Sequence, residues 1–248
     1  MASRARPSPG RIGLLRAQLR DQRSGRVVFV SHCLLDQNTR YLGGAYRPGA
    51  VREVIEPYLR DGTGIAQLPC PEQLAWGGVL KRRLLGLSAR PWLRRFLRPL
   101  VPALTAYTAL RYRLLARQVT GQIADHQRSG YEVVGVVGVD PSPSCGVRTT
   151  LDLGVALDAL ATCPLSRLDR GFMNDTVVAG SARPGRGLFV SALSDALARR
   201  GRQVPLLVHD LRSEAAGSPK PPGVVDAGVA GRPAGPPARR PAGPPARQ

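Results

Sequence analysis

Short apolar runs alternate with amphipathic stretches between residues 26 and 212 of the chain. The runs are rich in β-branched residues, which is typical of strands buried on both faces. They lie at residues 27–31, 65–68, 131–140 and 204–209. Strands that alternate with helices predict an α/β fold, here a three-layer, Rossmann-like domain with a mostly parallel sheet.

The amphipathic stretches predict helices at residues 50–60, 103–128 and 187–200. In the longest of these helices, a stripe of apolar residues at helical spacing is expected to face inward. The stripe consists of Leu104, Tyr107, Leu110, Leu114 and Val119. We therefore expect these side chains to be buried.

The two ends of the chain lack this alternation. Residues 1–24 are polar and rich in arginine, and we interpret them as a flexible basic arm. Residues 214–248 are rich in Pro, Gly and Ala, and near their end they contain two consecutive copies of the octapeptide RPAGPPAR. Such a composition lacks the apolar mass to offset the entropy of ordering, so we predict a disordered tail. The α/β domain then spans residues 25–213, with residues 80–118 as a basic helical insertion.

The formal net charge of +19 is confined to three segments. Residues 1–26, 80–118 and 213–248 carry +6, +10 and +3, so the rest of the chain is neutral overall. Only two of the 36 basic residues, Lys81 and Lys220, are lysines. A nucleic-acid binder would need aromatic stacking platforms or groove-reading helices. With 5% aromatic residues we see neither, which argues against a nucleic-acid partner. A substrate that is a thiolated base, free or within RNA, stays an alternative.

Three of the four cysteines come after a predicted strand: Cys33, Cys70 and Cys145. Neighbouring strands lie about 4.8 Å apart, so thiolates at the ends of parallel neighbours can meet around one metal centre. Spacing alone is equally compatible with three small buried hydrophobic residues. A zinc site is a further alternative, although the usual paired ligand spacing is absent. Cys163 does not follow a strand, and we expect it in the core or on a loop.

Three motifs in order resemble those of the TudS-type thiouracil desulfidases, most closely a branch of desulfidases related to TudS. They are VSHCLLDQNTRYLGG at residues 30–44, PCPE at 69–72 and SPSCG at 142–146. The segment at residues 185–210 is also similar to that branch. The resemblance covers residues 26–212 without the basic segment. Each motif is short, but three in order on an α/β pattern favour a metal centre over buried hydrophobic cysteines.

The resemblance implies a 4Fe-4S cluster held by Cys33, Cys70 and Cys145. One iron would stay open to take the sulfur of a small thiolated substrate. Glu72 and Ser142 match positions where catalytic groups are expected, Glu72 for proton transfer and Ser142 for hydrogen bonding to substrate or water. The alternatives are a helix cap for Glu72 and a turn residue for Ser142.

The first motif departs from the SACLLG-like sequence of the better-known desulfidases. His32 replaces the alanine and Asp36 the glycine, which puts the identity of the substrate in doubt. His32 is either a proton donor near the cluster or a packed imidazole. We predict that Asn38 and Arg40 line the same rim, where Arg40 would bind an anionic group of the substrate.

The sequence thus predicts a cluster-dependent desulfidase that releases sulfide from a compound such as a thiopyrimidine. The alternative is a non-catalytic iron–sulfur or zinc-binding regulatory or redox protein. Residues 80–98 alternate arginines with leucine and aromatic residues, as in segments that rest on anionic membranes or acidic partners. A solvated insertion over the site is the other interpretation of this segment. Four cysteines without a visible export signal indicate a reducing compartment, and we expect the cytoplasm.

Overall fold

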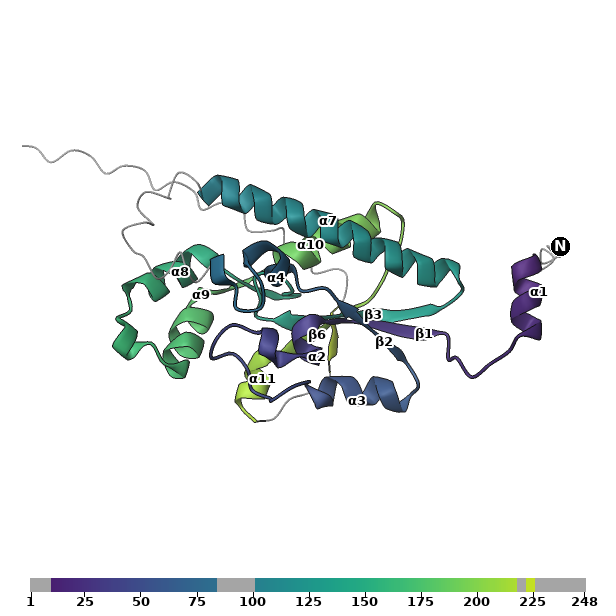
Figure 1. Cartoon of the computed structure of the whole chain (residues 1–248), viewed down its shortest axis with the longest axis horizontal. Helices are drawn as coiled ribbons and strands as arrows, with labels where there is room; N and C mark the ends of the chain where they lie inside the picture. The colour runs from purple at the N-terminus through teal and green to yellow at the C-terminus, as the bar shows by residue number, and fades with distance from the viewer. Residues whose placement is uncertain (1–9, 84–100, 218–221, 226–248) are drawn as a thin grey trace, which may run out of the picture.

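The computed structural model describes residues 10–83, 101–217 and 222–225. Within these residues the main sheet has the strand order β2-β1-β3-β6-β7 (Figure 1). Its strands are β1 (Arg26–Ser31), β2 (Gly64–Leu68), β3 (Glu132–Asp140), β6 (Leu206–Asp210) and β7 (Gly223–Val225). The first four pair in parallel, and β7 pairs antiparallel with β6. The prediction of a mostly parallel sheet is confirmed.

Helices cover both faces of this sheet and form the outer two of three layers (Figure 1). On one face lie α4 (Pro71–Trp76), α7 (Val101–Arg128) and α10 (Leu188–Ala198). On the other lie α2 (His32–Leu35), α3 (Arg52–Arg60) and α11 (Leu211–Ala215). Successive residues of a strand point to opposite faces, so Phe29 packs into the first core and Val28 and Val30 into the second. The three-layer α/β fold is confirmed.

The side of α7 that faces the core differs from the predicted stripe. Leu104, Tyr107, Leu110 and Leu114 are exposed, and of the predicted set Val119 is buried. The buried side consists of Thr108, Tyr112, Leu115, Ala116, Val119, Thr120, Ile123 and Ala124. Apolar residues occur on both sides of this helix, so their spacing does not select one. Small residues on the buried side allow close packing against α10, which is the neighbour that α7 contacts most.

Smaller elements surround this core. The strands β4 (Thr149–Leu151) and β5 (Ala182–Pro184) form an antiparallel pair beyond the main sheet. Between them lie α8 (Leu153–Thr162), the 3₁₀ helix η3 (Leu165–Arg167), the π-helix η4 (Phe172–Val178) and α9 (Ala179–Ser181). The remaining elements are α1 (Arg11–Gln18), inside the predicted basic arm, and the 3₁₀ helix η1 (Gln37–Thr39).

The predicted boundary between domain and tail is wrong at residue 214. Glu214 is buried in α11, and β7 extends the sheet beyond it. Residues 213–217 resemble the start of a polar tail in sequence. They are held to the domain through Glu214, whose partners Gln37 and Arg40 lie far away in the chain. The predictions for residues 1–9, 84–100, 218–221 and 226–248 concern positions outside the described residues.

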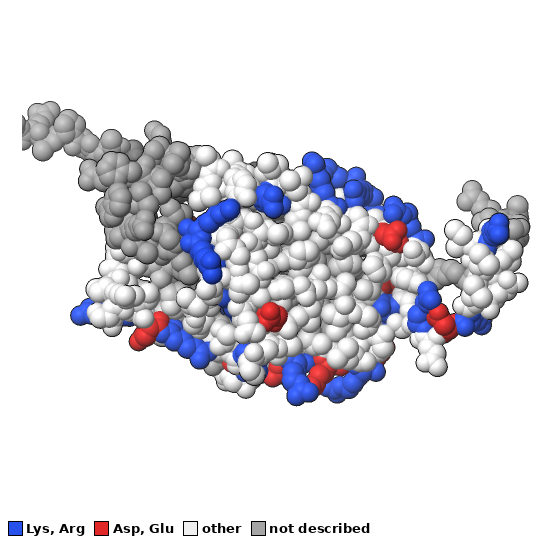
Figure 2. All heavy atoms as spheres, viewed as in Figure 1, with Lys and Arg blue, Asp and Glu red and all other residues white. Residues whose placement is uncertain are grey.

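Charged side chains are unevenly distributed over the face shown in Figure 2. Basic side chains gather along α7 and along the opposite margin, and uncharged side chains fill much of the area between them. Among the described helices, none has both the length and the apolar composition needed to cross a membrane.

Candidate functional site

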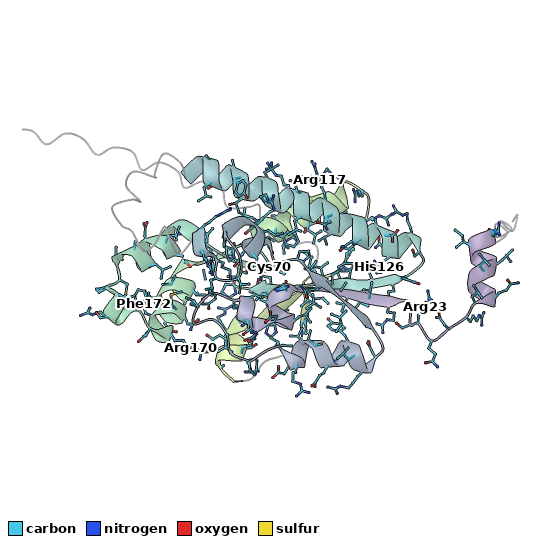
Figure 3. All side chains as sticks on the ribbon, in the orientation of Figure 1. Arg23, Cys70, Arg117, His126, Arg170 and Phe172 are labelled. Atoms are coloured by element: carbon cyan, nitrogen blue, oxygen red, sulfur yellow. The ribbon has the colours of Figure 1, made fainter. Side chains whose placement is uncertain are left out.

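The sheet brings the three cysteines that follow strands to one edge. Their strands are direct neighbours in the order β2-β1-β3 and run parallel, so their carboxyl ends lie side by side. Cys33 lies in the first turn of α2, Cys70 caps the N-terminus of α4, and Cys145 lies in the loop after β3. Figure 3 shows Cys70 in the interior of the molecule, near α4. The predicted arrangement of the three strand ends is confirmed.

The three thiols lie close enough to affect one another's ionisation. Burial raises the pKa of Cys70 to about 12, and the negative charges of Glu72 and Cys33 contribute to the increase. The pKa of Cys145 is raised well above its ordinary value by burial and then by Cys33 and Cys70. Burial also raises the pKa of Cys33, whereas the positive charge of Arg40 lowers it. Without a metal these groups are neutral thiols, so a metal would have to displace their protons.

The described residues contain no group of three or more His, Cys, Asp or Glu side chains arranged to hold a metal ion. A single zinc ion needs all its ligands about 2.0–2.3 Å from one point. An iron–sulfur cube differs because each thiolate binds a separate iron, so its ligands converge less tightly. The zinc alternative therefore gains no support, and the cluster stays a prediction.

Hydrogen bonds within the loop after β3 fix the position of Cys145. The carboxylate of Asp140 is buried and accepts a hydrogen bond from the backbone N–H of Val147 at 2.7 Å. The hydroxyl of Ser142 accepts hydrogen bonds from the backbone N–H groups of Cys145 at 3.0 Å and Ser144 at 3.3 Å. Asp140 and Ser142 thus both bind backbone N–H groups of this turn, as considered above for Ser142, and Ser142 holds the backbone that carries the cysteine.

Two glycines allow this loop to pack closely. A Cβ on Gly146 would lie 2.5 Å from the carbonyl oxygen of Ser142, within the loop itself. A Cβ on Gly187, just before α10, would lie 2.5 Å from the carbonyl oxygen of Ser144. The N–H of Gly187 also donates to the carbonyl of Gly146 at 2.9 Å. The start of α10 therefore supports the loop that carries Cys145.

Glu72 has a partner on each carboxylate oxygen. Its Oε1 accepts a hydrogen bond from the hydroxyl of Ser144 at 2.8 Å, and its Oε2 lies 3.3 Å from Nζ of Lys81. Lys81 also donates to the carbonyl of Thr39 at 2.8 Å, and its side chain is 7% exposed. The Glu72 side chain is 16% exposed, so this fixed carboxylate retains some access to solvent.

Sequence reasoning missed Lys81 and Ser144 as members of this site. Ser144 stands between the two residues that the motif singles out, Ser142 and Cys145. Lys81 carried a signal, because it is one of only two lysines among 36 basic residues. A lysine retained against such a bias towards arginine indicates that a compact ammonium group is needed there.

Two predicted substrate-binding residues, His32 and Asn38, bind neighbouring side chains. The imidazole of His32 contacts the side-chain amide of Gln67, on β2. Asn38 is exposed, and its side chain donates to Asp36 at 2.7 Å. Within the described part of the chain, neither side chain has a polar contact with any of the three cysteines, although His32 directly precedes Cys33. Both roles considered for His32 therefore stay predictions.

Arg40, predicted to bind an anionic group of the substrate, binds a carboxylate of the chain itself. Its side chain is 3% exposed, and its two terminal nitrogens bind the carboxylate of Glu214 at 2.8 and 3.1 Å. Its positive charge also lowers the pKa of Cys33. Glu214 lies in the segment predicted to be a tail, so neither motif nor periodicity linked the two residues. The remaining guanidinium nitrogen, Nε, has no hydrogen-bond partner among the described residues.

Glu214 is the centre of a buried polar network. Besides Arg40, its carboxylate accepts hydrogen bonds from Gln37 at 2.8 Å and from Nε2 of His209. Although burial favours the neutral acid, the hydrogen bonds from His209 and Arg40 dominate and lower the pKa of Glu214 to about 2. The network therefore holds a carboxylate that stays ionised in the protein interior.

Tyr112 extends from α7 towards the thiols. Its side chain is buried, and its ring lies 6.3 Å from that of Trp76. Burial raises the pKa of Tyr112, and the negative charges of Glu72, Cys145 and Cys70 raise it further. The hydroxyl has no hydrogen-bond partner among the described residues.

Cys163 lies at the C-terminal end of α8, away from this arrangement. Its thiol donates to the carbonyl of the next residue, Pro164, at 3.5 Å. This placement matches the loop position expected for it.

Comparison with known proteins adds little about activity. No family model matches the chain, and no solved structure matches it significantly. An uncharacterized protein of the archaeon Methanocaldococcus jannaschii is 33% identical over 94 residues. The aligned region covers 36% of this chain and 60% of the archaeal protein, so the chain spans less than two thirds of that relative. The resemblance to desulfidases therefore depends on the motifs.

Proposed function

We propose that the protein is an iron–sulfur-dependent desulfidase that removes sulfur, as sulfide, from a small thiolated compound such as a thiopyrimidine. The observation that carries the proposal is the meeting of Cys33, Cys70 and Cys145 at the ends of three adjacent parallel strands. The similarity of their motifs to those of TudS-type desulfidases supports the same assignment.

The groups around the thiols suit an anionic cofactor better than three neutral thiols. Lys81 lies near Cys33 and Cys70, and Arg40 lies near Cys33 with its Nε unpartnered. Buried cations and free donors stabilise the negative charge of a cluster bound by thiolates. Cys33, Cys70 and Cys145 would hold a 4Fe-4S cluster, and three ligands leave one iron open. When bound, the cluster would supply a thiophilic site for the sulfur of the substrate.

The chain's own contribution to the reaction centres on Glu72. Replacing sulfur by oxygen consumes one water: the water oxygen bonds to the thiocarbonyl carbon, the carbon–sulfur bond breaks, and hydrogen sulfide leaves. No electrons are gained or lost. Glu72 accepts a proton from the attacking water and returns it to the departing sulfur or to the ring. Each carboxylate oxygen has two lone pairs, so Glu72 can do this while bound to Ser144 and Lys81.

Other predicted residues take supporting roles in this proposal. Ser144 and Lys81 orient Glu72, and Ser142 holds the loop of Cys145. The four cysteines are all free, which fits a reducing compartment, and we place the protein in the cytoplasm. A contact of residues 80–98 with an anionic membrane or an acidic partner stays a prediction for a segment that lies mostly outside the described residues.

The test is anaerobic reconstitution followed by counting of iron and acid-labile sulfide. We expect four of each per chain in the wild type, and loss of the chromophore in Cys33→Ala, Cys70→Ala and Cys145→Ala. Cys163→Ala is the matched control and is expected to retain the cluster. The wild type should then release sulfide from 2-thiouracil or a related thiopyrimidine.

Each alternative predicts a different outcome. A chain that binds zinc but no iron would contradict the cluster. A full cluster that Cys163→Ala also abolishes would contradict the open iron. A cluster that releases no sulfide from any of a panel of thiolated heterocycles would favour the non-catalytic regulatory or redox protein.

A further inference from the structure

The hydroxyl of Tyr112 is a buried donor that has no acceptor among the described residues. The side chain is 1% exposed and lies in the same core as Trp76 and Cys145. Leaving a buried hydroxyl unpaired destabilises a protein, whereas phenylalanine would fill the same space without that cost. A tyrosine at this position therefore needs a partner beyond those that the described residues provide.

The groups nearest the hydroxyl identify the kind of partner. Tyr112 lies in the same core cluster as Cys145, and Glu72, Cys145 and Cys70 are the groups whose charges act on its hydroxyl. Oε1 of Glu72 accepts a hydrogen bond from Ser144, Oε2 forms an ion pair with Lys81, and the hydroxyl of Tyr112 forms no hydrogen bond with either oxygen. Besides Glu72, the polar groups on that side of the site are the sulfur atoms of Cys70 and Cys145. Thiolates and the inorganic sulfides of a cluster accept hydrogen bonds, and such bonds adjust the reduction potential of the cluster.

We propose that Tyr112 donates a hydrogen bond to a sulfur atom of the cofactor on its Cys70–Cys145 side. This inference rests on the proposed function, because it requires a cluster at the three thiols. Tyr112 is then a positioning residue that stabilises the bound cluster and fixes its orientation relative to Glu72. It also explains why α7, which contributes no metal ligand, places a polar atom in the site.

The experiment is a thermodynamic cycle on the full chain with Tyr112→Phe, with and without the cluster. Unfolding temperatures are measured anaerobically. In the cluster-free protein the substitution removes an unpaired hydroxyl, so the unfolding temperature is expected to stay the same or to rise. In the loaded protein it removes a hydrogen bond, and a loss of about 2–4 °C is expected. The reduction potential of the loaded variant should shift to a more negative value, because the lost bond favoured the reduced cluster.

Tyr107→Phe is the matched control, since Tyr107 lies on the same helix but is 38% exposed. It should change neither the unfolding temperatures nor the potential. An equal effect of Tyr112→Phe in the loaded and cluster-free proteins, with an unchanged potential, would overturn the role of Tyr112 and leave the proposed function intact. A wild type that takes up no iron and sulfide would overturn both, and the iron count identifies that case.

Discussion

Two polar clusters lie at the same edge of the sheet and are built in opposite ways. Around Glu214, Arg40, Gln37 and His209 supply donors to one buried carboxylate, so most of the polar groups satisfy one another. Near the three thiols, the buried hydroxyl of Tyr112 has no acceptor among the described residues. We call the Glu214 network the closed cluster, because its side chains mostly bind one another; under the proposed function, the donors near the thiols would bind the cofactor. Two atoms of the closed cluster, Nε of Arg40 and Nδ1 of His209, also have no hydrogen-bond partner in the described part of the chain.

The largest effect is expected when the closed cluster loses its charge. Glu214→Gln leaves the buried guanidinium of Arg40 uncompensated, and we expect a loss of about 3–5 kcal/mol in the free energy of unfolding. Glu132→Gln is the control, because Glu132 pairs with Arg26 at 3.2 Å but is 63% exposed. It should cost less than about 1 kcal/mol in urea unfolding. Equal losses for the two variants would show that the Glu214 network is no more than a surface ion pair.

Acid should weaken the closed cluster next. The pKa of Glu214 is lowered from 4.5 to about 2 in the folded chain. A lowered carboxyl pKa contributes stability above the unfolded value and loses it as the pH falls, here between about 4.5 and 2, by about 3 kcal/mol in total. Urea unfolding at a series of pH values measures this. The acid-dependent loss should be smaller in Glu214→Gln, and an unchanged pH profile in that variant would contradict the assignment.

Substitutions near the three thiols should change the rate of sulfide release more than the free energy of unfolding. Lys81→Met removes the ammonium that holds Glu72 and one of the cations near the thiols. Because the three thiolates still bind the cluster, we expect most of the iron to be retained and sulfide release to fall about 10–100-fold. Arg82→Met, at the exposed neighbouring position, should keep the wild-type rate. Loss of iron together with rate in Lys81→Met would instead show that Lys81 retains the cluster and does not act through Glu72.

The smallest effect separates the two roles considered for Ser142. If Ser142 is a turn residue whose hydroxyl binds two backbone N–H groups, its replacement by alanine should lower the free energy of unfolding by about 1 kcal/mol. Sulfide release per cluster should then persist. Asn38→Ala, at an exposed position, should change the free energy of unfolding by less than about 0.5 kcal/mol. A Ser142→Ala variant that keeps its iron but releases no sulfide would restore the catalytic role implied by the desulfidase motif.

The sequence was sufficient for the four parallel strands and for the position of each cysteine after a strand, but not for β7. Buried strands such as β1 and β3 are continuous apolar runs, and that signal is local. The convergence of Cys33, Cys70 and Cys145 follows once the strands are taken as parallel neighbours. The order β2-β1-β3 places all three cysteine-bearing strands next to one another.

What the sequence did not reveal depends on contacts between distant residues. The pairing of Arg40 with Glu214 joins two segments far apart in the chain, and neither motif nor periodicity links them. The buried side of α7 is chosen by its packing on α10, because both sides of the helix carry apolar residues. Tyr112, with its unpaired hydroxyl, lies on the side that the spacing did not select.

Gly187 shows how far the requirements of a site can extend. It has no side chain and cannot bind, protonate or ligate anything, yet any larger residue would push against the carbonyl of Ser144 and displace the loop of Cys145. A mutational scan for lost activity would therefore be expected to score this position alongside the cysteines. Selection for chemistry would then preserve an amino acid whose side chain contributes only the space it leaves empty.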